Sequence, residues 1–197
     1  MLPGPLLEIE NLPKVKIPIG MQNLTIRSAN PPIPLFIENM LSQAINLRLL
    51  CLPGIADLSL DLAHLRRLKQ LRLAMKCSQP TLVFPPGCIQ ELRINRGLLD
   101  SFLQAVAHRD LARLQILFID EDNDLTNEQL TLVARNCSIQ NLRISANQQI
   151  TGSGIREFVE NSQALQKLHI SNCYNVSPDV VTWARNRGIQ VGYLWSG

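Results

Sequence analysis

Apolar positions along the chain follow a recurring pattern, apolar-x-x-apolar-x-apolar. The copies are Met21-Leu24-Ile26, Leu47-Leu50-Leu52, Leu68-Leu71-Leu73, Ile89-Leu92-Ile94, Leu114-Leu117-Ile119, Ile139-Leu142-Ile144 and Leu165-Leu168-Ile170. Their first positions lie 26, 21, 21, 25, 25 and 26 residues apart. One copy alone would mean little, but seven copies at a narrow spacing predict a chain built from one repeated structural unit.

Each copy predicts a short strand, because its last two apolar positions alternate with one exposed residue. Between strands, apolar residues recur at helical spacing over residues 36–44 and 98–107. Thr126-Asn-Glu-Gln129 fits a capping box, and Ser177-Pro178 fits an N-cap followed by proline at the first helical position. These signals predict helices after several of the strands.

Four prolines argue against helices between some of the strands in the first half of the chain. These four are Pro53, Pro80, Pro85 and Pro86. Because proline removes a backbone donor and clashes with the preceding helical turn, we expect loops or short turns between these strands rather than helices.

One strand with one helix cannot bury its own apolar face, so the units must stack. The sequence therefore predicts an α/β fold, a curved leucine-rich repeat solenoid with a parallel sheet on the concave face and helices and loops on the convex face. We expect an N-terminal cap over residues 1–20, about seven repeats over 21–188 and a capping strand over 189–197. A partial eighth copy, Ile189-Gln-Val191, begins that strand.

Residues 111–191 resemble the cysteine-containing subfamily of leucine-rich repeats, with its "C..L..L.L..C..ITD.GL..LA..C" pattern. Cys137 matches the cysteine at the end of the helix, and Cys173 matches the cysteine after the strand. The resemblance implies an interaction module like those of F-box proteins, the substrate receptors of cullin-based ubiquitin ligases. Residues 1–20 contain four prolines, which exclude an F-box-like helical hairpin there. The Skp adaptor and cullin would then bind a region outside this chain, or the chain is a relative without an F-box.

Composition narrows the class of protein. Apolar residues make up 46% and charged residues 18%, which is too apolar for a disordered chain and too evenly charged for a membrane span. The net charge of +3 argues against general binding of nucleic acid. The sequence shows no signal peptide, and its five cysteines form no CxxC pair. We therefore expect reduced thiols in an intracellular protein of the cytoplasm or nucleus.

Motifs of enzymes and metal sites are incomplete. His108-Arg109-Asp110-Leu111 spells the start of a kinase catalytic loop, but the other kinase motifs are missing. The acidic run over residues 120–124 lacks the glycine and glutamate of a calcium loop, which are Leu125 and Thr131 here. His64, His108 and His169 fall in separate segments. We therefore expect no enzyme, no catalytic residue, no metal ligand and no cofactor.

The repeat also predicts which side chains the concave face presents. The residues between the last two apolar positions form one outward column: Thr25, Cys51, Arg72, Arg93, Phe118, Arg143, His169 and Gln190. Two residues further along each strand, a second column contains Arg27, Pro53, Ala74, Asn95, Asp120, Ser145, Ser171 and Gly192. From these columns and their flanks we predict the partner-binding residues Arg72, Arg93, Arg96, Phe118, Arg143, Lys167 and His169.

This basic stripe has two interpretations. It is either ordinary solvated strand surface, partly neutralised by Glu91, Asp120 and Glu121, or a docking site for an acidic or phosphorylated protein segment. The favoured function is a protein-interaction module, the partner-recognition part of an F-box-type ligase subunit. The alternative is a non-catalytic scaffold subunit of a larger complex unrelated to ubiquitin.

Overall fold

The computed structural model describes residues 18, 20–26, 34–55, 59–75, 81–95, 97–120 and 124–194. The expected N-terminal cap over residues 1–20 lies almost entirely outside these residues. Several residues named above also lie outside them, namely Arg27, Pro80, Arg96, Glu121 and the end of the C-terminal segment beyond Leu194.

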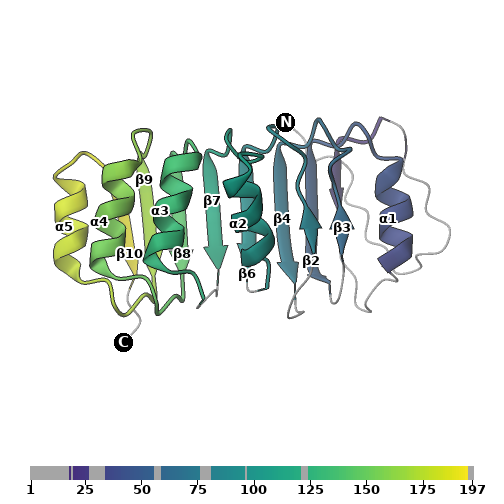
Figure 1. Cartoon of the computed structure of the whole chain (residues 1–197). Coiled ribbons are helices and arrows are strands. Elements are labelled where there is room, and N and C mark those ends of the chain that lie inside the picture. Colours follow the sequence, from purple (N-terminus) through teal and green to yellow (C-terminus); the bar gives the residue numbers. More distant parts are fainter. Residues whose placement is uncertain are drawn as a thin grey trace.

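Eight parallel strands form one sheet, in which neighbouring strands follow the order of the chain (Figure 1). They are β1 (Asn23–Thr25), β2 (Leu49–Ile55), β4 (Gln70–Met75), β6 (Glu91–Asn95), β7 (Ile116–Asp120), β8 (Asn141–Ser145), β9 (Lys167–Ser171) and β10 (Gln190–Leu194). The expected α/β fold with a parallel sheet is therefore confirmed.

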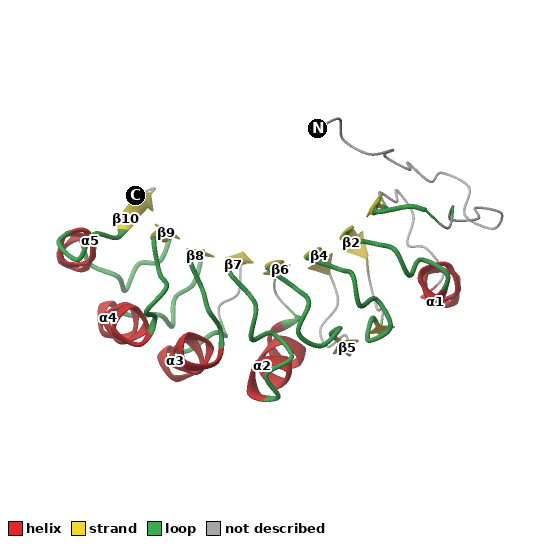
Figure 2. Ribbon diagram, turned by 90° about the horizontal axis from the view of Figure 1, so that it is seen from above, coloured by secondary structure: helices red, strands yellow, loops and turns green. Residues whose placement is uncertain are grey.

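Helices cover one face of this sheet, and the strands line the inside of the resulting arc (Figure 2). The helices are α1 (Pro34–Ser42), α2 (Leu99–Ala107), α3 (Asn127–Asn136), α4 (Gly152–Asn161) and α5 (Pro178–Arg185). In the connections after β2 and β4, the described residues form the short strands β3 (Leu60–Asp61) and β5 (Leu82–Val83), which pair in parallel. These two connections agree with the expectation of turns in place of helices.

The prediction for Pro53 was wrong in one respect. Pro53 does not interrupt a convex connection; it lies within β2, beside Ala74 of β4. The pairing of β2 with β4 shifts register between Pro53 and Ile55. A proline has no N–H to give to a ladder, so an irregularity of this kind is where a strand tolerates it.

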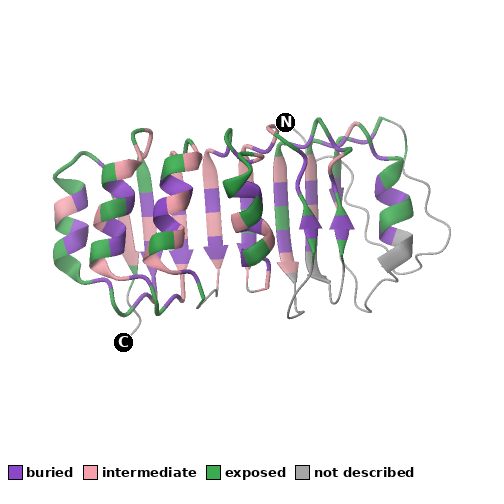
Figure 3. Ribbon diagram, viewed as in Figure 1, coloured by how far each residue is buried: buried purple, intermediate pink, exposed green. Residues whose placement is uncertain are grey.

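Strand pairing reproduces the register of the sequence repeat. The middle apolar residue of each copy lies beside that of the next, in the series Leu24, Leu50, Leu71, Leu92, Leu117, Leu142 and Leu168. All of these leucines are at most 1% exposed. Figure 3 shows the alternation along the strands, with buried bands between more exposed ones. The apolar pattern thus forms one continuous core between sheet and helices.

A second ladder is made by the backbone. In six of the seven copies, the residue after the first apolar position accepts two hydrogen bonds from the next copy; the Gln115 carbonyl, for example, accepts from the N–H groups of Gln140 (2.8 Å) and Asn141 (3.0 Å). The same double acceptance occurs at Gln22, Arg48, Lys69, Gln90 and Gln140. Five of the seven residues at this position are glutamine, namely Gln22, Gln90, Gln115, Gln140 and Gln166.

The last strand is displaced by two residues from its predicted register. Gly192, not Gln190, lies beside His169, and Gln190 lies beside Lys167. Val191 and Tyr193 take the apolar positions, and the Tyr193 hydroxyl donates a hydrogen bond to the Val176 carbonyl (2.9 Å). Because side chains alternate with period two, a slip of two residues keeps every side chain on its predicted face.

The predicted helix starts are present. Thr126 and Gln129 form a reciprocal capping box at α3. Ser177 is the N-cap of α5 with Pro178 in the first turn, but its hydroxyl donates to the Asp179 carboxylate and does not cap a backbone N–H. At the same end of the chain, the Trp183 ring lies 4.9 Å from the guanidinium carbon of Arg156 and 4.0 Å from that of Arg187.

Helices α3 and α4 are joined through one asparagine. Asn127 donates to the Thr151 hydroxyl (2.9 Å) and accepts from the Thr151 N–H (3.1 Å). A Cβ placed on Gly154 would meet the Asn127 side chain far inside contact distance. The close approach of the two helices therefore requires glycine at position 154.

Truncating the leucine ladder should destabilise the fold. We expect Leu117→Ala and Leu142→Ala each to lower the free energy of unfolding by ~2–5 kcal/mol, since both side chains are fully buried and each truncation leaves a cavity. Urea denaturation followed by circular dichroism measures this. The control is Ile45→Ala, because Ile45 is 55% exposed. Losses as small as the control's would contradict the burial described here.

Adding one methyl group at the contact of α3 with α4 should also destabilise the protein. Gly154→Ala forces Asn127 to move and to lose its bonds to Thr151, so we expect a loss of about 1–3 kcal/mol. Gly20→Ala is the matched control, because a Cβ at Gly20 meets nothing within 4 Å. Equal melting temperatures for the two variants would show that the helices do not depend on this contact.

Candidate functional site on the concave face

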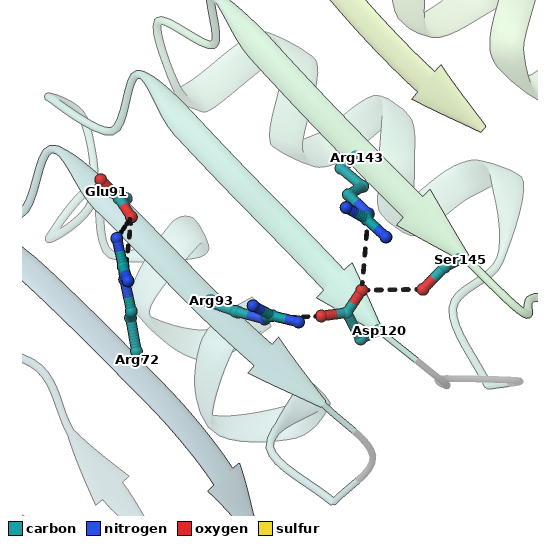
Figure 4. Close-up of polar contacts among 6 residues, drawn as sticks. All are labelled: Arg72, Glu91, Arg93, Asp120, Arg143 and Ser145. Atoms are coloured by element: carbon teal, nitrogen blue, oxygen red, sulfur yellow. Dashed lines mark hydrogen bonds and ion pairs between the residues drawn. The ribbon is translucent and has the colours of Figure 1, made fainter. Parts of the chain in front are cut away.

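Two of the predicted arginines are held by carboxylates of the sheet (Figure 4). Arg72 donates from Nε (3.1 Å) and Nη2 (2.8 Å) to Oε1 of Glu91. Arg93 donates from Nε to Oδ2 of Asp120 at 2.7 Å. The Glu91 and Asp120 side chains are 12% and 16% exposed, so both are better shielded from solvent than their arginine partners.

Asp120 is the centre of the longer of these networks. Its second oxygen, Oδ1, accepts a hydrogen bond from the Ser145 hydroxyl (2.8 Å) and lies 3.9 Å from Nε of Arg143. Arg143 Nε has no hydrogen-bond partner of its own. At 3.9 Å the contact is an ion pair without a hydrogen bond, so Arg143 is held less tightly than Arg93.

A hollow of about 420 Å³ lies over β2, β4 and β6. It is lined by Cys51, Arg72, Leu73, Ala74, Arg93, Ile94, Asn95 and Asp120. Both arginines in this lining already have carboxylate partners. The positive charge of this half of the concave face is therefore largely compensated within the protein.

A second hollow, of about 460 Å³, lies over β7 to β10. It brings together four of the predicted partner-binding residues, Phe118, Arg143, Lys167 and His169. Its remaining lining consists of Asn141, Leu168, Gln190, Val191 and Gly192. No carboxylate among the described residues lines it. We call this the aromatic-basic hollow.

His169 lies against the backbone of the last strand. A Cβ on Gly192 would stand 2.4 Å from Nδ1 of His169, so the glycine makes room for the imidazole ring. Burial in this position lowers the pKa of His169, and the positive charge of Arg143 lowers it further. His169 is therefore a neutral hydrogen-bonding group at neutral pH, not a third cation of the hollow.

The predicted site residues thus divide into three groups. Arg72 and Arg93 belong to the compensated half, the four residues named above line the aromatic-basic hollow, and Arg96 lies outside the described residues. The repeat predicts that Ser145 faces outward, but it does not predict the hydrogen bond from Ser145 to Asp120. The two residues lie side by side on neighbouring strands, and this adjacency could have indicated the bond.

In the described part of the chain, no group of three or more metal-ligating side chains comes together, and none of the helices has the length and hydrophobicity of a membrane span. The described cysteines, Cys51, Cys88, Cys137 and Cys173, form no disulfide. Burial raises the pKa of the Cys137 thiol to about 12, which leaves it protonated and unreactive at neutral pH.

Comparisons with known proteins do not assign the chain to a family. It matches no protein-family model, and no curated protein matches it.

The lowered pKa of His169 predicts a pH dependence of stability. A histidine whose pKa is lower in the folded state binds fewer protons there than in the unfolded chain, so stability falls as the pH drops below about 6.5. We expect the melting temperature of the wild type to fall more between neutral and mildly acidic pH than that of His169→Gln. Calorimetry at a series of pH values measures this. Parallel curves for the two proteins would show that His169 titrates normally.

Proposed function

We propose that this chain is a leucine-rich repeat solenoid whose concave face binds a protein partner through an acidic or phosphorylated segment. The observation that carries the proposal is the aromatic-basic hollow. Phe118, Arg143 and Lys167 line it together with His169, and no carboxylate of the described residues joins them.

The solenoid assignment is supported by the agreement between sequence repeat and strand register. One strand is added per copy, every strand pairs with the strand of the next copy, and the convex connections contain either a helix or a short strand. Stacking of this kind is how units that cannot bury their own apolar face form a common core.

The charge distribution favours the C-terminal half of the concave face as the docking site. Arg72 and Arg93 would have to leave Glu91 and Asp120 before binding another carboxylate. Arg143 has only a distant ion pair, and Lys167 has none within the described residues. An aromatic ring beside such cations is typical of interface positions that contribute most to affinity.

The more specific proposal is that the partner is a substrate of an F-box-type ubiquitin ligase. It rests on the resemblance to the cysteine-containing repeats. Cys137 is the C-cap of α3, and Cys173 is buried two residues after β9, where its thiol donates to the Ser171 carbonyl (3.5 Å). A small buried thiol after the strand is consistent with a structural role within the repeat.

Site-specific photo-crosslinking in cells tests where the partner binds. A benzophenone amino acid at position 118 of the full chain should capture a protein through an acidic segment, identified by mass spectrometry. The double variant Arg143→Glu with Lys167→Glu should reduce this capture several-fold, because like charges would then face each other. Position 83 on β5 is the convex control, since Val83 is 45% exposed.

Two results would overturn parts of this proposal. Crosslinks from position 83 without crosslinks from position 118 would place the binding surface on the convex side. Crosslinks from position 118 that survive the double charge reversal would contradict an acidic segment. Recovery of a Skp adaptor and a cullin with the native protein tests the ligase assignment separately, and a fixed complex lacking both would contradict it.

A further inference from the structure

A third hollow, of about 380 Å³, lies away from the concave columns, at the edge of the sheet where β2, β4, β6 and β7 begin (the upper edge in Figure 1). Its lining consists of Arg48, Arg66, Arg67, Lys69, Cys88, Gln90 and Arg113. Five of these seven residues are cations, and none is a carboxylate. We call this the edge hollow.

The cations of the edge hollow are not compensated by the described part of the protein. None of them forms an ion pair with a described carboxylate. Arg67 donates from Nη1 to the Asn46 amide oxygen (2.8 Å), a neutral acceptor. All five side chains are exposed, so water screens their mutual repulsion in the free protein. A bound anion would relieve that repulsion.

Two of the cations break a regularity of the repeat. The position whose carbonyl accepts hydrogen bonds from the next copy is glutamine in five of seven copies, and the two exceptions are Arg48 and Lys69. At all of these positions the backbone carbonyl accepts hydrogen bonding from the next copy, so the fold does not require a cation there. Arg66, Arg67 and Arg113 then add charge from the turns before β4 and β7. The charge is therefore gathered locally, on adjacent repeats.

We propose that the edge hollow binds a phosphate group carried by a segment of a partner protein, such as a phosphorylated serine or threonine. Guanidinium groups pair with the oxygens of a phosphate dianion through parallel hydrogen bonds, and clusters of arginine are the usual readers of phosphorylated segments. The volume of the hollow lies near the lower end of the range of ligand pockets, roughly 300–1,000 Å³, which leaves room for the phosphate and the residue that carries it.

The lining favours a phosphorylated protein segment over nucleic acid. None of its residues is aromatic, so it offers no ring on which an unpaired base could stack. Its five cations line a single hollow of about 380 Å³, whereas contact with a series of backbone phosphates requires cations spaced along an extended surface.

The thiol in the lining does not suggest covalent chemistry. Burial raises the pKa of Cys88, against the opposing effect of Arg66 and Arg113. Its Sγ donates toward the carbonyls of Leu65 (3.7 Å) and Pro85 (3.6 Å). Cys88 therefore lines the hollow as a protonated thiol.

The repeat itself supplies the variant that tests the proposal. Arg48→Gln with Lys69→Gln restores the residue found in the other copies, so the fold should be kept, as a thermal melt verifies. The control is Arg135→Gln with Arg185→Gln, which removes two exposed cations from the last turns of α3 and α5. A third variant, Arg143→Gln with Lys167→Gln, removes the cations of the aromatic-basic hollow. The probe is a fluorescent Gly-Ser peptide containing two phosphoserines, titrated into the full chain by anisotropy at two salt concentrations.

We expect the edge variant to weaken binding of the phosphopeptide about tenfold or more, because charge-assisted hydrogen bonds are lost. The control Arg135→Gln with Arg185→Gln should bind as the wild type does, and raising the salt concentration should weaken wild-type binding more than that of the edge variant. A wild-type affinity matched by the edge variant would overturn the site. Loss of binding in Arg143→Gln with Lys167→Gln, with normal binding by the edge variant, would assign the phosphate to the aromatic-basic hollow.

Competition distinguishes the phosphate's source. The unphosphorylated peptide should not bind, and pyrophosphate should displace the phosphopeptide only at much higher concentration. If pyrophosphate binds as tightly as the peptide, a free anion is the ligand and the proposed protein segment is wrong. Tighter binding of a mixed-sequence single-stranded RNA, lost in the edge variant, would likewise overturn it.

Discussion

In six of the seven repeats, a single backbone carbonyl accepts two successive N–H groups at the start of the next strand, and this contact fixes both the distance and the register between those neighbouring repeats. Because the acceptor belongs to the backbone, the side chain at that position is free to vary. Glutamine, arginine and lysine all occupy it. Once register is fixed, equivalent residues of successive repeats lie about 4.8 Å apart, which places apolar residues in the core and polar ones in columns.

The strands and their register were predictable, because an apolar side chain two residues from another must share its face. The final strand shows the limit of this reasoning. Periodicity of two assigns Gln190 and Gly192 to the same face but cannot decide which of them lies beside His169. The contact of that histidine with a residue lacking a side chain decides it. Pro53 shows another limit, since a proline can stay within a strand where the ladder is irregular.

The site was predictable in position but not in charge balance. The repeat predicts the outward column, and three of its expected binding residues, Phe118, Arg143 and His169, line one hollow together with Lys167 from its flank. The sequence does not predict which arginines form ion pairs with carboxylates, because this depends on how side chains of neighbouring strands meet, as Arg93 and Asp120 do. The edge hollow was not predictable from the strand pattern, because its five cations all lie outside the strands. The sequence signal for this hollow is that Arg48 and Lys69 replace glutamine directly before β2 and β4.

The contact of the Trp183 ring with two guanidinium groups affects how unfolding of this protein can be observed. The chain has two tryptophans, Trp183 and Trp195, and both belong to its C-terminal end. In an array whose units contact mainly their neighbours, the ends can open before the middle does. Emission from Trp183 therefore follows the release of α5 from α4, while the ellipticity of the backbone averages over the whole arc. Two transitions recorded by these probes would differ because they observe different units, even if each unit opens in a single step.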